Sequence, residues 1–158
     1  MTPAVVALER AGVAFDVVTY DHDPAAPSFG AEAAEALGVD GSEVFKTLVA
    51  ALDTGERVVG VVPVICRLDL KAIARAAGAK RATLADVAAA ERRTGYVAGG
   101  ISPFGQRTRL RTFVDESAEL WERVHVSGGR RGMEVVVEPG TFAEVLDAVF
   151  CDLTGSTS

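Results

Sequence analysis

Two apolar runs separated by a short polar turn constrain the fold of this chain more than any other feature. The runs cover residues 44–52 and 57–65, and the sequence Asp-Thr-Gly-Glu at residues 53–56 joins them. Runs of this length, rich in valine and bounded by turn residues, are typical of paired strands. They predict a β-hairpin with a four-residue loop, and therefore a chain organised around a sheet.

Weaker patterns on either side of the hairpin predict further helices and strands. Thr2 followed by Pro3 indicates the start of a helix, and Asp69 and Gly78 suit the two ends of another. Further strands are expected at residues 15–20, 95–100, 111–114, 123–127 and 133–138, and further helices at 84–93 and 139–149. Because strands outnumber helices and cluster into hairpins, the sequence predicts an α+β fold with a mixed, mainly antiparallel, barrel-like sheet and surrounding helices.

Length and residue usage bound the class of protein. The 158 residues suffice for one hydrophobic core, and we expect a single domain over residues 1–153 with a frayed tail at 154–158. Cys66 and Cys151 lie 85 positions apart, so a disulfide framework is not predicted. The two histidines form no close pair, so no metal site is predicted, and no cofactor is expected. The sequence shows no signal peptide and no run of 18 apolar residues, which predicts a cytoplasmic protein without a membrane partner.

The charge of the chain is distributed unevenly. Its formal net charge is -6, which by itself argues against a general nucleic-acid binder. However, residues 1–45 carry a net charge of -7, residues 46–131 carry +6 and residues 132–158 carry -5. Scattered surface charge is one interpretation of this pattern, and a cationic face that meets an anion is the other.

Lys46 is the most informative single residue, because it places an ammonium group among the apolar residues of a predicted strand. Such a group must reach water or meet an anion. It is either an edge-strand lysine that prevents aggregation or a group that binds a phosphate or carboxylate at a pocket mouth.

Tyr20 is either an amphipathic residue at the sheet rim or a donor to a substrate oxygen. His22 lies between two acidic residues, where a solvated surface histidine is the simpler interpretation.

Two glycine-rich segments, residues 94–105 and 127–129, are places where backbone N–H groups can approach a ligand without a Cβ in the way. Each segment alone is also compatible with a tight turn. Ser102 resembles the nucleophile of a hydrolase, but Phe104 stands where the nucleophile elbow needs glycine. An anionic ligand shared by Lys46 and both segments explains these features together.

Through these residues the chain resembles the YbaK/EbsC family of aminoacyl-tRNA deacylases over nearly its whole length. The order and spacing of seven segments carry the resemblance: residues 1–5, 19–24, 44–48, 68–71, 94–96, 99–103 and 126–129. The resemblance implies a compact α+β domain with a mixed sheet around a small pocket. It also implies a trans-editing enzyme without a cofactor, which releases cysteine from Cys-tRNA(Pro) by attack of the substrate's thiol on its own ester carbonyl.

The resemblance also assigns roles to particular residues. Lys46 matches the family's essential lysine and is expected to act at the terminal adenosine phosphate or the ester. Tyr20 is expected to line the pocket as the second catalytic residue. The residues expected to bind the substrate are Thr47, Gly99, Gly100, Ile101, Ser102, Ser127, Gly128 and His22. The implied partners are the aminoacylated 3′ end of tRNA(Pro) and, transiently, prolyl-tRNA synthetase, with this chain a monomer.

Two alternatives stay open at the level of the sequence. Editing of Ala-tRNA(Pro) would need an attacking water, because alanine carries no thiol. A non-catalytic module that binds tRNA or a synthetase would protect its ligand without turnover. Phe45, Cys66 and Phe104 depart from the residues commonest in the family and bear on the choice between cysteine and another small amino acid.

Overall fold

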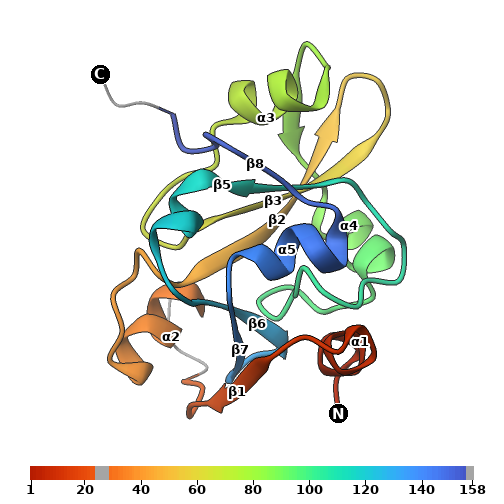
Figure 1. Cartoon of the computed structure of the whole chain (residues 1–158). Helices are drawn as coiled ribbons and strands as arrows, with labels where there is room; N and C mark the ends of the chain where they lie inside the picture. The colour runs from red at the N-terminus through yellow and green to blue at the C-terminus, as the bar shows by residue number, and fades with distance from the viewer. Residues whose placement is uncertain (24–28, 156–158) are drawn as a thin grey trace.

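The computed structural model describes residues 1–23 and 29–155 as two β-sheets with helices packed around them (Figure 1). In chain order the elements are α1 (Pro3–Ala11), β1 (Phe15–Thr19), α2 (Phe29–Leu37), β2 (Phe45–Leu52), β3 (Arg57–Pro63), α3 (Leu70–Ala77), β4 (Ala82–Leu84), α4 (Val87–Thr94), β5 (Thr112–Asp115), the 3-10 helix η1 (Glu116–Leu120), β6 (Val124–Arg130), β7 (Met133–Val137), α5 (Gly140–Leu146) and β8 (Val149–Cys151). The α+β class predicted from the sequence is confirmed.

The larger sheet contains the predicted hairpin at its centre. Its strand order is β4-β2-β3-β5-β8, with β2 antiparallel to β3 and β4, and with β5 parallel to both β3 and β8. The hairpin register runs from Phe45 opposite Pro63 to Ala51 opposite Arg57. The Leu52 N–H donates to the Glu56 carbonyl at 2.8 Å and closes the turn. The hairpin is therefore confirmed, with strand ends within two residues of those expected.

The smaller sheet has the order β1-β7-β6, and both of its pairings are antiparallel. A parallel bridge between Val44 and His125 connects it to the larger sheet. The predicted mixed sheet is confirmed, although the described residues form no closed barrel. The strands at the two edges of the larger sheet, β4 and β8, have three residues each and lie at opposite ends of the strand order, so they do not pair with each other.

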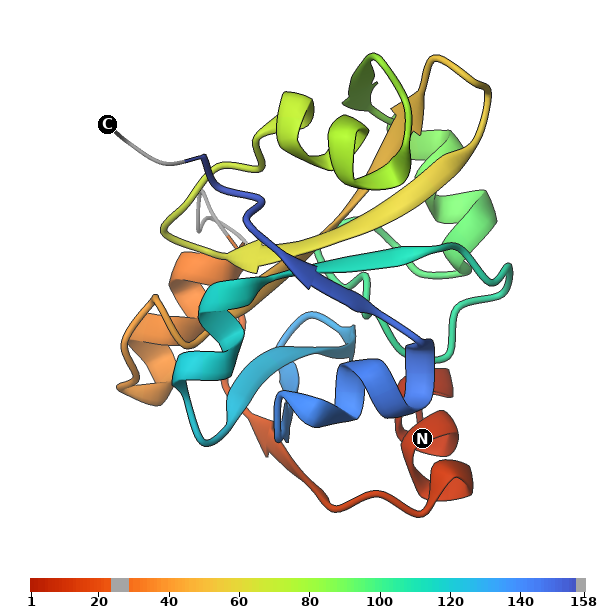
Figure 2. The same cartoon turned by 45° about the horizontal axis from the view of Figure 1, so that its top comes forward.

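Alternate residues of β3 face two different hydrophobic clusters. Val59 and Val61 pack with the smaller sheet, α1 and α5, whereas Val58 and Val62 pack with Ile73 of α3. Figure 2 shows α3 on one side of the larger sheet and α5 on the other. Because strand side chains alternate between the two faces, the continuous apolar run of β3 serves both clusters.

Helix caps formed as the sequence indicates. The Val5 N–H donates to the Thr2 hydroxyl at the start of α1. The Asp69 carboxylate accepts from two N–H groups at the start of α3, and Gly78 ends that helix with a φ of 81°. These interactions depend on residues close in sequence, which is why sequence patterns predict them.

Three local predictions differ from the structure. Residues 95–100 form a loop instead of a strand, because Gly95 and Gly99 adopt positive φ values of 82° and 89°, which extended strands exclude. The helix expected at 84–93 begins at Val87, after the short strand β4, with Asp86 as its N-cap. The helix expected at 139–149 ends at Leu146, and the strand β8 follows.

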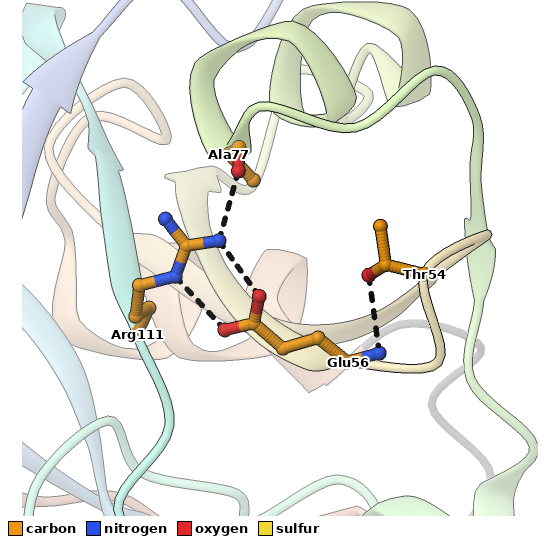
Figure 3. A network of polar contacts seen from close by, with 4 residues as sticks. All are labelled: Thr54, Glu56, Ala77 and Arg111. Carbon is orange, nitrogen blue, oxygen red and sulfur yellow. Dashed lines mark hydrogen bonds and ion pairs between the residues drawn. The ribbon is translucent and has the colours of Figure 1, made fainter.

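An arginine–carboxylate pair fixes the hairpin turn to the rest of the larger sheet (Figure 3). Two nitrogens of Arg111 donate to the two carboxylate oxygens of Glu56 at 2.8 and 2.7 Å, and one also donates to the Ala77 carbonyl at 2.9 Å. Arg111 precedes β5, Glu56 precedes β3 and Ala77 ends α3. The planar guanidinium therefore joins three elements at one end of the sheet.

No helix among residues 1–23 and 29–155 is long and apolar enough to cross a membrane. Of the predicted tail, Thr154 and Gly155 are described and residues 156–158 lie outside the described part of the chain. The predicted domain boundary at residue 153 stays a prediction.

Candidate active site

A cavity of about 470 Å³ opens beside β2, between the two sheets and α4. Its walls come from five parts of the chain: the first half of β2, the segment from β4 into α4, the 98–101 loop, the hairpin of β6 and β7, and Tyr20 at the end of β1. The described residues that line it are Tyr20, Phe45, Lys46, Thr47, Leu48, Val49, Leu84, Ala85, Val87, Ala90, Ala98, Gly99, Ile101, Ser127, Arg130 and Glu134. A cavity of this size is suited to a small ligand.

Lys46 and Thr47 lie on the wall that β2 provides. Burial lowers the pKa of Lys46, and no described carboxylate forms an ion pair with it. The Thr47 hydroxyl oxygen is buried and has no hydrogen-bond partner among the described residues. A half-buried ammonium without a carboxylate partner is best stabilised by an anionic or polar ligand, so Lys46 makes this wall of the cavity suited to such a ligand.

Ser127 and Glu134 lie side by side on the hairpin wall, because the β6–β7 register pairs them directly. Glu134 is only 5% exposed, and desolvation raises its pKa to about 8. Its carboxyl group is therefore mostly protonated at neutral pH, and it is the one carboxyl group among the described lining residues. Glu134 was not predicted from the sequence as a site residue. The feature of the sequence that could have identified it is an acidic residue within the otherwise apolar strand Met133–Val137. Acidic side chains are almost never fully buried without a partner, so one in such a strand marks an unusual environment.

Tyr20 reaches the same end of the cavity from β1. Its backbone N–H donates to the Gly132 carbonyl at 2.9 Å, which ties it to the turn between β6 and β7. Burial raises the pKa of the Tyr20 hydroxyl, and the charges of Glu134 and Glu32 act in the same direction. A phenol with a raised pKa keeps its proton and serves as a hydrogen-bond donor.

The glycine-containing loop is held in place from α4. The Ala98 N–H donates to the Glu91 carboxylate at 2.8 Å, and the Gly100 N–H donates to the Val97 carbonyl at 2.9 Å. A Cβ built on Gly100 would lie 2.8 Å from the Cα of Arg130. Glycine is thus required at residue 100 for the loop to approach the β6–β7 hairpin.

Six of the ten residues predicted for the site line the cavity: Tyr20, Lys46, Thr47, Gly99, Ile101 and Ser127. The other four are Gly100, Ser102, Gly128 and His22, and they lie nearby or behind the lining. The Ser102 side chain is fully buried, with its hydroxyl accepting from the Phe104 N–H. The Gly128 carbonyl accepts from the Thr2 hydroxyl. His22 Nδ1 lies 2.7 Å from Glu32 Oε1.

The three residues that depart from the family pattern lie in different places. Phe45 lines the cavity, whereas Phe104 is fully buried and its ring stacks on that of Phe142 with the ring centroids 5.5 Å apart. Cys66 lines a second, separate cavity. Of the three, only Phe45 is among the described residues that line the first cavity, although Cys66 interacts electrostatically with Lys46.

The first cavity lacks an assembled nucleophile. Ser127 is the only described lining residue with a primary hydroxyl, its oxygen accepts from the Gly129 N–H, and no histidine lines the cavity. Within the described part of the chain, no three histidine, cysteine or acidic side chains are grouped as metal ligands. The lining residues supply hydrogen-bond donors, cations and one protonated carboxyl group, which suits the binding and polarisation of an ester.

Comparisons with known proteins agree with this description. The sequence model of the aminoacyl-tRNA editing domain matches residues 23–145. EbsC of Enterococcus faecalis, named provisionally as a Cys-tRNA(Pro)/Cys-tRNA(Cys) deacylase, is 35% identical over 121 residues, which cover 77% of this chain and 74% of EbsC. A crystal structure described provisionally as a trans-editing enzyme for prolyl tRNA synthetase superposes with a TM-score of 0.85 at 27% identity, covering 98% of this chain and 96% of that one. A crystal structure of a protein described only as hypothetical gives the same score and identity, covering 97% and 99%.

The structure is that of a single-domain α+β protein with a ligand-sized cavity beside β2. The chain belongs to the aminoacyl-tRNA editing domain family. Within that family it is an aminoacyl-tRNA deacylase of the YbaK/EbsC type, so the resemblance seen in the sequence is confirmed.

Proposed function

We propose that this deacylase releases cysteine from Cys-tRNA(Pro) in trans, after prolyl-tRNA synthetase has attached it in error. The observation that carries the proposal is the polar end of the cavity, where Lys46, Thr47 and protonated Glu134 belong to a described lining that contains no nucleophile–base pair. The provisional names of EbsC and of the structural neighbour support the same substrate.

The chemistry of amino-acid selection explains why such an enzyme is needed. Cysteine is no larger than proline, so the synthetase cannot exclude it by size. A difference of one methylene group changes binding by only about 1–3 kcal/mol, which is too little for accurate translation. A second site that accepts the wrong amino acid and hydrolyses its ester removes the error.

The charged groups of the site match the charges of an aminoacyl ester. Glu134 is positioned to meet the α-ammonium group of the amino acid. Pairing with that cation lowers the cost of ionising a buried carboxyl group, so binding would convert Glu134 to the carboxylate. Lys46 is assigned to the phosphate of the terminal adenosine or to the ester, and Tyr20 donates to a substrate oxygen.

The thiol of the substrate acts as the nucleophile in this proposal. Its sulfur attacks the carbonyl carbon of the same cysteinyl group, a C–S bond forms, and the C–O bond to the ribose breaks. The thiol proton passes to the ribose oxygen that leaves, and the product is a four-membered thiolactone that water then opens. Because the reaction is intramolecular, correct positioning alone lowers the barrier by up to about 7–11 kcal/mol.

Backbone groups complete the proposed site. The loop at Gly99 and Ile101 holds the carbonyl region, and Ser127 contacts the aminoacyl end. Donors from the backbone that stabilise the developing oxyanion contribute about 3–4 kcal/mol each in comparable enzymes. Gly100, Ser102, Gly128 and His22 do not line the cavity, so any contribution they make is through the position of their neighbours.

A deacylation panel tests the proposal. Purified protein is incubated with tRNA(Pro) carrying cysteine, serine or alanine, and release of the amino acid is followed. We expect fast release of cysteine and slow release of serine and alanine, because only the thiol cyclises readily. Equal rates for cysteine and alanine would contradict cyclisation and support attack by water.

Lysine variants provide the matched control. Lys46→Ala is expected to lose most of the activity, whereas Lys71→Ala, at an exposed lysine of α3, is expected to keep it. Stoichiometric protection of Cys-tRNA(Pro) without turnover would indicate a binding module instead of an enzyme.

We also propose that prolyl-tRNA synthetase delivers the tRNA. The overall acidic charge of the chain argues against tight, indiscriminate binding to the body of the tRNA. Repeating the panel with and without the synthetase tests this, and a rate that is independent of the synthetase would contradict it. The expectation of a monomer stays a prediction.

A further inference from the structure

A second cavity, of about 400 Å³, lies apart from the candidate active site, and we call it the η1 groove. It is formed by η1 and its flanking residues, the turn that follows β3 and the segment before β2, which Figures 1 and 2 show on the same side of the molecule. The described residues that line it are Ser42, Pro63, Ile65, Cys66, Asp115, Ser117, Leu120, Trp121 and Thr154. None of these lines the first cavity, so the two cavities are separate.

The η1 groove presents apolar side chains to solvent. Leu120 is 85% exposed and Ile65 is 67% exposed, and beside them Trp121 is half-buried against the main hydrophobic core. The buried Asp115 carboxylate already accepts from the Leu153 N–H at 2.9 Å. Large apolar side chains that stay uncovered around a cavity mark a site where another molecule binds.

Acidic residues predominate around this apolar surface. Five exposed acidic residues either adjoin a lining residue in the sequence or accept a hydrogen bond from one: Asp40, Glu116, Glu119, Glu122 and Asp152. Burial, and after it the charges of Asp115, Glu116 and Asp152, raise the pKa of the Cys151 thiol, which shows that these carboxylates lie close together. Arg67 is the one exposed basic residue that adjoins a described lining residue in the sequence. The rim of the groove is therefore negatively charged.

We propose that the η1 groove docks a segment of a partner protein that presents a bulky apolar side chain between lysine or arginine residues. The apolar side chain covers Ile65, Leu120 and Trp121, and its basic neighbours meet the acidic rim. Carboxylates repel the phosphates of nucleic acids and of anionic membranes. A second copy of this chain docked through the same face would bring two acidic rims together. A basic protein segment is the occupant that agrees with both the charge and the apolar surface.

The groove adjoins the candidate active site without being part of it. Cys66 lines the groove and interacts electrostatically with Lys46, which lines the first cavity. A partner docked in the groove therefore lies close to the site of deacylation and leaves the lining of the first cavity free. The inference does not depend on which aminoacyl ester the enzyme cleaves.

The fluorescence of Trp121 tests the inference. Trp121 is the only tryptophan of the chain, so its emission reports on the groove in the unmodified protein. The probe is a short synthetic peptide in which lysines flank two leucines, and matched peptides replace the lysines by glutamates or the leucines by glycines. We expect the lysine–leucine peptide to shift the emission to shorter wavelength in a saturable manner. Both matched peptides are expected to bind at least about tenfold more weakly, and salt is expected to weaken binding of the first peptide.

Variants of exposed residues test the two parts of the groove. Leu120→Ser is expected to weaken binding of the lysine–leucine peptide about tenfold, because it removes apolar contact area. The double variant Glu119→Gln and Glu122→Gln is expected to weaken binding and to reduce its dependence on salt. Val17→Ser is the matched control, since Val17 is 45% exposed on β1 and lines neither cavity. Circular dichroism confirms that each variant is folded.

Each outcome bears on the inference. Saturable binding that requires Leu120 and the two glutamates supports it. Absence of a saturable change in emission up to about 1 mM peptide would overturn it, because a docking site for such a segment binds more tightly than that. Equal binding of either matched peptide, or equal weakening by Val17→Ser, would overturn it as well. A concentration-dependent dimer in sedimentation that Leu120→Ser abolishes would overturn it in favour of a second copy of the chain.

Discussion

Replacing Glu134 by glutamine is expected to stabilise the fold at neutral pH and to weaken substrate binding. The carboxyl group is 5% exposed, and desolvation raises its pKa to about 8. In the unfolded chain the same group titrates near 4.5. Between these two values the folded state holds a proton that the unfolded state has released, so stability decreases as the pH rises.

The size of this effect follows from the two pKa values. One unit of pKa difference corresponds to about 1.4 kcal/mol. At pH 7, which is about 2.5 units above the pKa in the unfolded chain, ionisation of Glu134 favours the unfolded state. It lowers the free energy of unfolding by roughly 3 kcal/mol relative to acidic conditions. Glutamine has nearly the same shape and no charge, so the variant should avoid this cost. The difference in stability between variant and wild type should grow from about pH 5 to about pH 8 and then level off.

Urea unfolding at a series of pH values measures the effect. The free energy of unfolding is compared between wild type, Glu134→Gln and a control variant, Glu138→Gln, which changes an exposed carboxylate four residues further along. Subtracting the two curves removes the contributions of all other titrating groups. We expect the difference in free energy of unfolding from wild type to change with pH for Glu134→Gln and not for Glu138→Gln.

Two results would refute the reasoning. If wild type and Glu134→Gln lose stability in parallel across this pH range, the carboxyl group is not protonated in the folded state. If the variant is more stable and still binds Cys-tRNA(Pro) as tightly as wild type, Glu134 does not meet the α-ammonium group.

Two further substitutions test the loop and the sheet. Gly100→Ala is expected to reduce deacylation at least tenfold and stability by about 1–3 kcal/mol, because the added Cβ collides with the backbone of Arg130. Gly140→Ala is the control; its Cβ meets no atom within 4 Å, so a comparable loss there would contradict the steric argument. Glu56→Gln is expected to lower the free energy of unfolding by about 0.5–1 kcal/mol, since it weakens the half-exposed pair with Arg111. Thermal unfolding at low and high salt checks this, and a loss that salt does not reduce would argue against an electrostatic origin.

Some site residues could be found from the sequence because their signals are local. Lys46 interrupts an apolar strand, and the consecutive glycines at residues 99 and 100 mark a backbone that can approach a ligand closely. Recognition of the family added Thr47 and gave a role to Ser127, which begins the second glycine-containing segment. Glu134 was missed, because the sequence does not show that both faces of the strand Met133–Val137 are buried by other segments.

The sequence by itself determined the hairpin, the capped helices and the α+β class, because each depends on interactions between residues close along the chain. The tertiary structure alone decided that β1, β7 and β6 form a separate sheet and that the strands of the described residues do not close into a barrel. It also decided which predicted residues share one cavity, and it raised the pKa of Glu134 by removing water from around it. Burial and desolvation depend on segments distant in sequence, and a pattern of residues along one strand carries no record of what packs against it.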